Sequence, residues 1–234
     1  MKLSNKVISV ILIIGPVFSY GYKKINKLSN DKITFQTKKK LTKHINSKFK
    51  TVKIGEQTWM AENLNIDHYR NGDLIPEIQD AEQWKNMISG AWCYLDNKLK
   101  NGKKYGKLYN WYAVNDLRGL APEGWHIPTY GEFQTLEIAV NQNGNSLKSK
   151  EQGNGNGVGT NTTGFSALFA GGRLSFGQFK LIEISTYNVA IFWSSTKYGN
   201  FDAAYLFYLF SHDSSSGLNY DDFESGYSVR CVKD

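Results

Sequence analysis

The chain has 234 residues and a formal net charge of +7, which is unevenly distributed. Residues 1–50 contain twelve Lys and one Asp, a net of +11, and subtracting this from +7 leaves −4 for residues 51–234. An acidic domain is poorly suited to binding phosphates, so we exclude nucleic acid as its expected partner.

The first 21 residues have the pattern of a secretory signal peptide. Lys2 and Lys6 precede an apolar run over residues 7–18, and small residues follow near residue 21. The run is short for a membrane span, which needs about 20 apolar residues. We therefore expect a secreted or cell-surface protein. The alternative is an uncleaved leader, which is the only contact with a membrane that we expect.

Residues 22–50 carry ten Lys, one Asp and no Trp or Pro. A segment of this composition is too polar to bury a core. We predict a basic tether that is disordered or loosely helical.

Residues 51–234 are predicted to form one domain. All six Trp lie here, and 28 of these 184 residues are aromatic, which is enough for a substantial core. Short strand-like runs are separated by turn dipeptides such as Asn71-Gly72, and this favours β structure with long loops over a helical bundle. Residues 205–210 are apolar at every position, which predicts a strand buried on both faces.

Two or three helices are predicted within the domain. Thr129 and Glu132 have the spacing of a capping box, and apolar residues then recur on one face up to Val140. A second helix is predicted over residues 108–114, and a short helical turn is predicted to begin at Asp80. The predicted fold class is therefore α+β, with short antiparallel strands, two or three helices and long loops.

Eight short motifs follow one another along the domain. They are Trp59-Met60-Ala61-Glu62-Asn63-Leu64, Gly90-Ala91-Trp92-Cys93-Tyr94, residues 105–114, residues 119–129, Phe165-Ser166-Ala167-Leu168, Gly171-Gly172-Arg173, Trp193-Ser194-Ser195-Thr196 and Ser228-Val229-Arg230-Cys231-Val232. In this order they resemble the Fibrobacter succinogenes major paralogous domain family. The resemblance implies an exported bacterial protein, often one of many paralogues, with a C-type-lectin-like fold and no general biochemical activity.

The chain contains two cysteines, Cys93 and Cys231. Many members of this family have Cys where this chain has Ala121, so Cys93 is the remaining candidate partner for Cys231. Export favours oxidation. We therefore expect a Cys93–Cys231 disulfide, worth roughly 4 to 5 kcal/mol on the chain-entropy model. Two buried free thiols are the alternative.

By analogy with receptor proteins that share the fold, the resemblance implies a ligand face between Lys197 and Glu224. This segment is rich in Tyr, Ser, Gly, Asn and Asp, which combine rigid amphipathic contacts with adaptable hydrogen bonds, as in antibody paratopes. The alternative is a tyrosine-rich hairpin that only packs. The candidate ligand-binding residues are Tyr198, Phe201, Tyr205, Asn219, Tyr220, Asp221, Asp222 and Phe223.

The acidic residues of this face are also candidates for calcium binding. Asp221, Asp222 and Glu224 would supply the hard oxygen ligands that calcium prefers, although a solvated acidic turn is the commoner outcome, and no cofactor is expected. His126 is adjacent to Trp125, and we interpret it as a packed, hydrogen-bonded histidine rather than a catalytic one. No histidine has metal-ligand spacing, and no nucleophile elbow or phosphate loop is present.

The sequence therefore predicts a non-enzymatic, exported module that binds an extracellular glycan or protein. One alternative is a structural or adhesion component of a cell-surface assembly. Another is an enzyme acting on surface polysaccharide, which would need a pair of acid/base carboxylates across a cleft. The oligomeric state stays open.

Overall fold

The computed structural model describes residues 49–150, 152–179 and 189–234. These residues belong to one unit of the chain, Asn46–Asp234. The predicted signal peptide and nearly all of the predicted tether lie outside the described residues. Within the described residues, no helix combines the length and the apolar character needed to cross a membrane.

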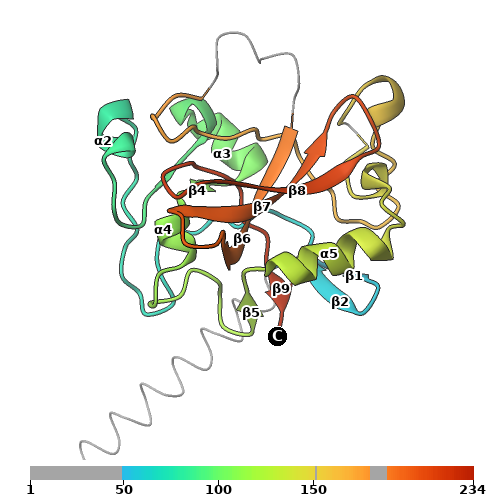
Figure 1. Ribbon diagram of the computed structural model, residues 1–234, viewed down its shortest axis with the longest axis horizontal. Coiled ribbons are helices and arrows are strands. Elements are labelled where there is room, and N and C mark those ends of the chain that lie inside the picture. Colours follow the sequence, from blue (N-terminus) through green and yellow to red (C-terminus); the bar gives the residue numbers. More distant parts are fainter. Residues whose placement is uncertain (1–48, 151, 180–188) are drawn as a thin grey trace, which may run out of the picture. The chain divides into compact units, whose positions relative to one another are not determined.

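The described strands form three sheets in which every pairing is antiparallel (Figure 1). The first sheet has the strand order β1 (Thr51–Ile54), β2 (Gln57–Met60), β9 (Val232–Lys233) and β5 (Trp125–His126). The second sheet pairs β3 (Trp92–Cys93) with β4 (Leu108–Tyr109). The third has the order β6 (Val189–Lys197), β7 (Ala203–Phe210) and β8 (Ser216–Asp222).

Four α-helices accompany these sheets in the described part of the chain. They are α2 (Ala81–Lys85), α3 (Leu99–Tyr105), α4 (Trp111–Val114) and α5 (Tyr130–Ala139), and three short 3-10 turns lie at Leu95–Asn97, Gly144–Ser146 and Gly155–Gly157. The coarse prediction of a mixed fold with antiparallel strands is confirmed. The predicted helix at 108–114 is instead divided, because its first residues pair with β3 and only its last four form α4.

The predicted capping box of α5 is present. The Thr129 hydroxyl accepts a hydrogen bond from the Glu132 amide at 3.2 Å, and the Glu132 carboxylate accepts one from the Thr129 amide at 2.8 Å. Phe133 then stacks on Phe207 of β7, with ring centroids 4.9 Å apart. This contact fixes α5 against one face of the β6–β8 sheet.

Strand β7 is covered on both faces, as its sequence predicts. Phe207 and Leu209 belong to the core cluster beneath α5. Leu206 belongs to a second cluster on the opposite face, and both faces are therefore closed to solvent along the middle of the strand.

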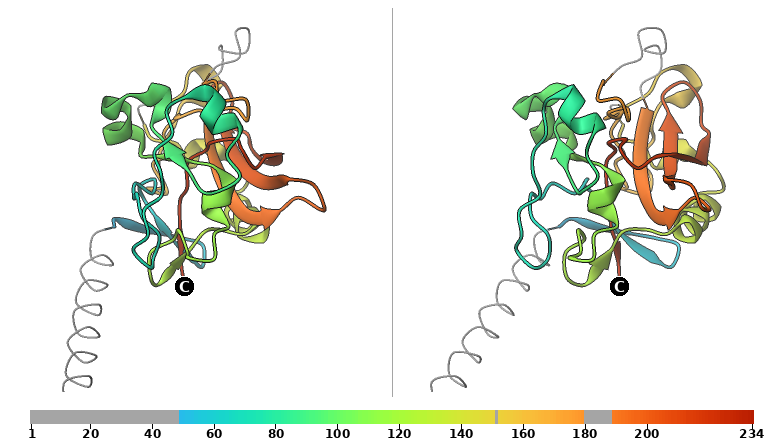
Figure 2. Two further views of the ribbon diagram at one scale, coloured as in Figure 1. Left: turned by 90° about the vertical axis from the view of Figure 1, so that its left-hand side faces the viewer. Right: turned by 60° about the vertical axis from the view of Figure 1, so that its left-hand side comes forward.

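The C-terminal segment joins the sheets to one another. Tyr227 pairs with Tyr109, and Ser228 pairs in parallel with Phe192 of β6. Val232 in β9 then pairs with both β2 and β5. Figure 2 shows this segment, in dark red, passing between the green elements that include α3 and α4 and the orange β6 strand.

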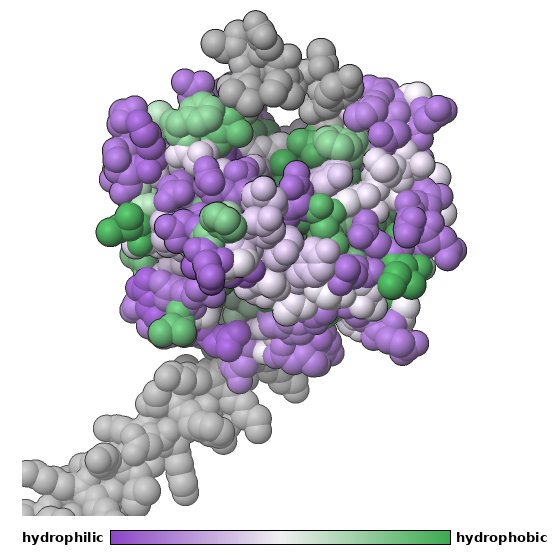
Figure 3. All heavy atoms as spheres, viewed as in Figure 1, coloured by the Kyte–Doolittle hydropathy of each residue, from purple (hydrophilic) through white to green (hydrophobic). Residues whose placement is uncertain are grey.

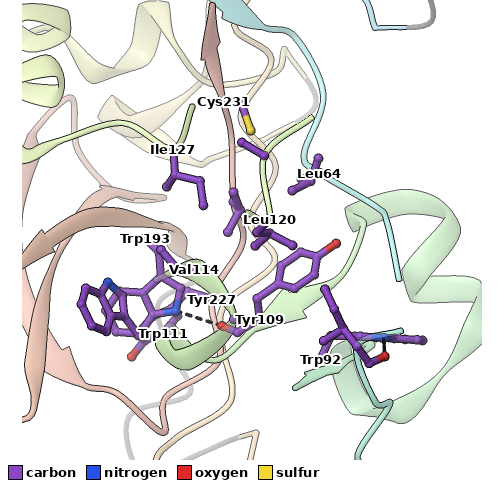
Figure 4. Packing of buried hydrophobic residues seen from close by; sticks show 14 of the residues in the cluster. Leu64, Trp92, Tyr109, Trp111, Val114, Leu120, Ile127, Trp193, Tyr227 and Cys231 are labelled. Atoms are coloured by element: carbon purple, nitrogen blue, oxygen red, sulfur yellow. Dashed lines mark hydrogen bonds between the residues drawn. The ribbon is translucent and has the colours of Figure 1, made fainter. Parts of the chain in front are cut away.

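Four tryptophan side chains belong to the largest core cluster, and Figure 4 labels three of them, Trp92, Trp111 and Trp193. The Trp193 indole donates a hydrogen bond to the Tyr109 carbonyl at 2.9 Å. The Trp111 indole donates to the Ser194 carbonyl, also at 2.9 Å. Because these N–H groups have partners, burial of the rings does not leave unpaired donors.

The predicted disulfide is wrong, and the alternative of two buried free thiols is confirmed. Cys93 and Cys231 are both buried and unpaired. Cys93 packs beside Trp84 in one core cluster, whereas Cys231 packs in the cluster around Trp193. Burial raises the pKa of each thiol to about 12, so neither is a reactive thiolate at neutral pH.

Candidate ligand-binding surface

Five aromatic side chains form one cluster at the end of the β6–β8 sheet, which we call the aromatic platform. Tyr198 stacks on Tyr220 with ring centroids 3.7 Å apart and an interplanar angle of 5°. Tyr198 also lies 5.7 Å from Phe201 and 5.2 Å from Tyr205, and Tyr205 lies 4.4 Å from Tyr130. The platform comprises Tyr130, Tyr198, Phe201, Tyr205 and Tyr220.

The register of the sheet brings these rings together. Tyr205 of β7 and Tyr220 of β8 are direct cross-strand partners, so their side chains share one face of the sheet. Tyr198 follows β6 immediately, and its amide donates to the Ala203 carbonyl at 2.8 Å, which closes the turn between β6 and β7. These backbone hydrogen bonds hold three of the rings on rigid structure.

The platform is accessible to solvent. The exposed fraction is 66% for Phe201 and 48% for Tyr220, while Tyr130, Tyr198 and Tyr205 are half-buried. On the face of the molecule drawn in Figure 3, several hydrophobic groups lie among hydrophilic and intermediate residues. The platform is an exposed group of aromatic rings that stack on one another.

One tyrosine of the platform, Tyr198, has a shifted pKa. The Tyr220 hydroxyl, through a hydrogen bond and through charge repulsion, raises the pKa of Tyr198 above its ordinary value. The Tyr198 hydroxyl therefore stays protonated at neutral pH and can donate as well as accept hydrogen bonds.

The predicted polar contacts divide between the two faces of β8. Asp222 lies two residues from Tyr220 and so shares the face of the platform, where it is exposed. Asn219 and Asp221 belong to the opposite face. The Asp221 carboxylate accepts a hydrogen bond from the Tyr227 hydroxyl. Of these three residues, only Asp222 is placed beside the aromatic rings.

Phe223 is part of the core and does not contribute to the ligand face as predicted. It is 6% exposed and stacks on Trp111 with ring centroids 4.2 Å apart. Strand β8 ends at Asp222, and the Phe223 amide donates to the Asp202 carbonyl at 3.0 Å. The change of direction at the strand end turns the ring inward.

The carboxylates proposed for calcium do not converge. The Glu224 carboxylate accepts from the Tyr112 hydroxyl at 2.7 Å, and Asp221 and Asp222 lie on opposite faces of β8. Over the ranges that the structure describes, no group of three or more His, Cys, Asp or Glu side chains is arranged to hold a metal ion.

Residues 52–233 match the sequence model of the Fibrobacter succinogenes major domain. The chain belongs to this family. The resemblance inferred from the eight motifs is thereby confirmed, and the family domain accounts for all of the described strands except the first residue of β1. No curated protein and no solved structure matches the chain.

His126 of the family domain bridges two carboxylates. Its Nδ1 lies 2.7 Å from Asp234, and its Nε2 lies 2.6 Å from Glu132 in the capping box. Burial alone would lower the pKa of the imidazole, but the hydrogen bonds and charges of the two carboxylates outweigh burial and raise it. This arrangement links the C-terminal residue to the start of α5.

Tyr130 is the member of the platform that the sequence did not identify. It is the first residue of α5, and its amide donates to the Thr196 hydroxyl at 3.0 Å. A sequence signal was available, because Tyr130 precedes Phe133 by three residues and so lies on the same side of α5 as that buried ring. Its packing partner, Tyr205, lies on the distant strand β7.

Proposed function

We propose that the domain is an exported, non-catalytic binding module that recognises an extracellular glycan or protein through the aromatic platform, and that of the two a glycan fits best. The observation that supports this proposal is the pair of exposed rings, Phe201 and Tyr220, held by stacking on Tyr198. Rigid aromatic rings supply contact area with little loss of side-chain entropy on binding. The net charge of −4 on residues 51–234 argues against nucleic acid.

A glycan suits the size and chemistry of this surface. The flat C–H faces of a sugar ring stack on aromatic rings, and its hydroxyls can bond to the Asp222 carboxylate and the tyrosine hydroxyls. A stable protein partner usually buries about 800 Å² on each side. The platform consists of five aromatic side chains, three of them half-buried, and is therefore smaller than such an interface.

We also propose that the domain has the C-type-lectin-like fold that the family resemblance implies. Strand β2 near the start of the domain pairs with β9 at its end, and long loops lie between them. This pairing of the two ends supports the assignment.

A glycan array probed with the full chain tests the proposal. We expect binding that Tyr220→Ala weakens by about tenfold or more, equivalent to ~1.4 kcal/mol. Phe176→Ala is the matched control, because Phe176 is 41% exposed and lies in the turn at residues 174–178, outside the platform. A silent array from a folded, monodisperse sample would contradict the glycan proposal and favour a protein ligand or self-association.

The same array, run with calcium and again with chelator, tests the metal. Calcium-dependent binding lost in Asp222→Ala would assign the ion to this face. Binding that is unchanged by chelator would assign recognition to the rings alone.

A further inference from the structure

Two arginine side chains are almost completely buried, and they differ in how their charge is accommodated. Arg173 and Arg230 are each 1% exposed. All three nitrogens of Arg173 donate to backbone carbonyls, at residues 78–80 and 177, over distances of 2.6 to 3.1 Å. Four of the five N–H groups of the Arg173 guanidinium are therefore hydrogen-bonded to backbone carbonyls.

Arg230 has far fewer partners. Its Nη1 donates to the Phe165 carbonyl, and its Nη2 donates to Asn63 Oδ1 at 2.5 Å. Its Nε is buried and has no hydrogen-bond partner among the residues that the structure describes. The rings of Phe165 and Phe192 lie 4.2 and 5.2 Å from the guanidinium. Two of the five N–H groups are thus used, and an under-satisfied buried cation is costly unless an anion accompanies it.

A groove lies beside residue Arg230. It has a volume of about 210 Å³, and Arg230 forms part of its wall. Lys103 and Lys104, in the last turn of α3, also line it, together with Asn63, Ser166 and the exposed carboxylate of Glu62. The charged groups of the lining sum to +2, from three cations and one carboxylate, so the groove attracts anions.

We propose that this groove binds a small oxyanion group, namely a carboxylate, sulfate or phosphate, between Arg230 and the ammonium groups of Lys103 and Lys104. The volume is below the roughly 300 to 1,000 Å³ of sites for whole small molecules, and it suits one ionic group at the end of a larger ligand or a free ion. Guanidinium pairs with planar and tetrahedral oxyanions through charge-assisted hydrogen bonds. The site is separate from the aromatic platform and does not depend on it.

Titration of the ¹⁵N-labelled full chain with acetate, sulfate and inorganic phosphate, at ionic strength held constant with chloride, tests this proposal. We expect saturable shifts of the amide signals of Asn63, Gly106 and Ser166. The order of affinity among the three anions identifies whether the groove prefers a carboxylate, a sulfate or a phosphate group. Shifts that increase linearly without saturation for all three anions would overturn the proposal.

Three variants sharpen the titration. Lys103→Gln with Lys104→Gln removes two cations at exposed positions and weakens anion binding by about 3- to 10-fold. Glu62→Gln removes the one like charge in the lining and strengthens binding by about 2- to 5-fold. Lys85→Gln, at an exposed lysine of α2, is the control and leaves the affinity unchanged.

Arg230→Met tests the buried cation directly and abolishes the saturable shifts. If that variant does not fold, the opposite effects of the lysine and Glu62 variants still decide the question. Equal affinities in the lysine double variant, the Glu62 variant and the Lys85 control would contradict the proposal, because binding would then reflect general charge screening.

Discussion

Two aromatic stacks at the end of strand β8 have nearly the same geometry and different surroundings. Tyr220 stacks on Tyr198 at 3.7 Å and 5°, and Phe223 stacks on Trp111 at 4.2 Å and 13°. The first stack carries a ring that is 48% exposed, whereas Phe223 is 6% exposed. Stacking alone therefore does not identify a binding surface. Exposure on a rigid support distinguishes the aromatic platform from the core.

The largest expected effect is on the buried stack. Phe223→Ala removes a ring that contacts Trp111 and Tyr112, and leaves a cavity in the largest core cluster. We expect a loss of about 3 to 5 kcal/mol in the free energy of unfolding, measured by urea denaturation. A loss in the free energy of unfolding below about 1 kcal/mol is typical of surface substitutions. That result would contradict the assignment of the Phe223–Trp111 stack to the core.

A smaller, pH-dependent effect is expected at the start of α5, which carries Tyr130 of the platform. The folded protein raises the pKa of His126, so its contribution to stability is present below the unfolded pKa of about 6.5 and is lost as pH rises through the folded value. Glu132 has a lowered pKa in the folded state, despite the opposing effect of burial, so its contribution is lost as pH falls through that lower value.

Stability from this contact is therefore greatest between the unfolded pKa of Glu132, about 4.3, and that of His126, about 6.5. Because the imidazole is 38% exposed, we expect less than about 1 kcal/mol. Unfolding curves from pH 4 to 9 measure it, and His126→Gln should flatten the profile on its alkaline side. An unchanged profile in that variant would assign the pH dependence to other groups.

The two cysteines provide the smallest expected effect. Because Cys93 and Cys231 are buried free thiols with raised pKa values, reductant should leave the melting temperature unchanged. A thiol reagent should modify neither residue in the folded protein and both after unfolding without reductant. A fall in melting temperature on adding reductant would contradict this account and indicate a Cys93–Cys231 disulfide.

Local patterns in the sequence were sufficient for part of the fold. The capping box at Thr129 and the two-sided burial of residues 205–210 were predicted correctly, since both leave a pattern in a short stretch of sequence. The family was also correctly identified from its motifs.

Features that depend on distant contacts were not predictable in the same way. Tyr220 and Phe223 lie three residues apart in one polar run, and only the end of β8 and its contact with Asp202 turn one ring outward and the other inward. The cysteine pairing failed for a related reason, because sequence does not say that the two thiols pack in different clusters. The missing partner of Arg230 likewise appears only when the residues around it are assembled.

The central claim is that the aromatic platform binds a ligand rather than completing the core. We would measure glycan binding and urea unfolding on the same samples of the unmodified chain, Tyr220→Ala and the Phe176→Ala control. The account predicts that Tyr220→Ala loses binding by about tenfold or more while its free energy of unfolding falls by less than about 1 kcal/mol. Unchanged binding, together with a loss of stability as large as that of Phe223→Ala, would show that the platform is a packing element.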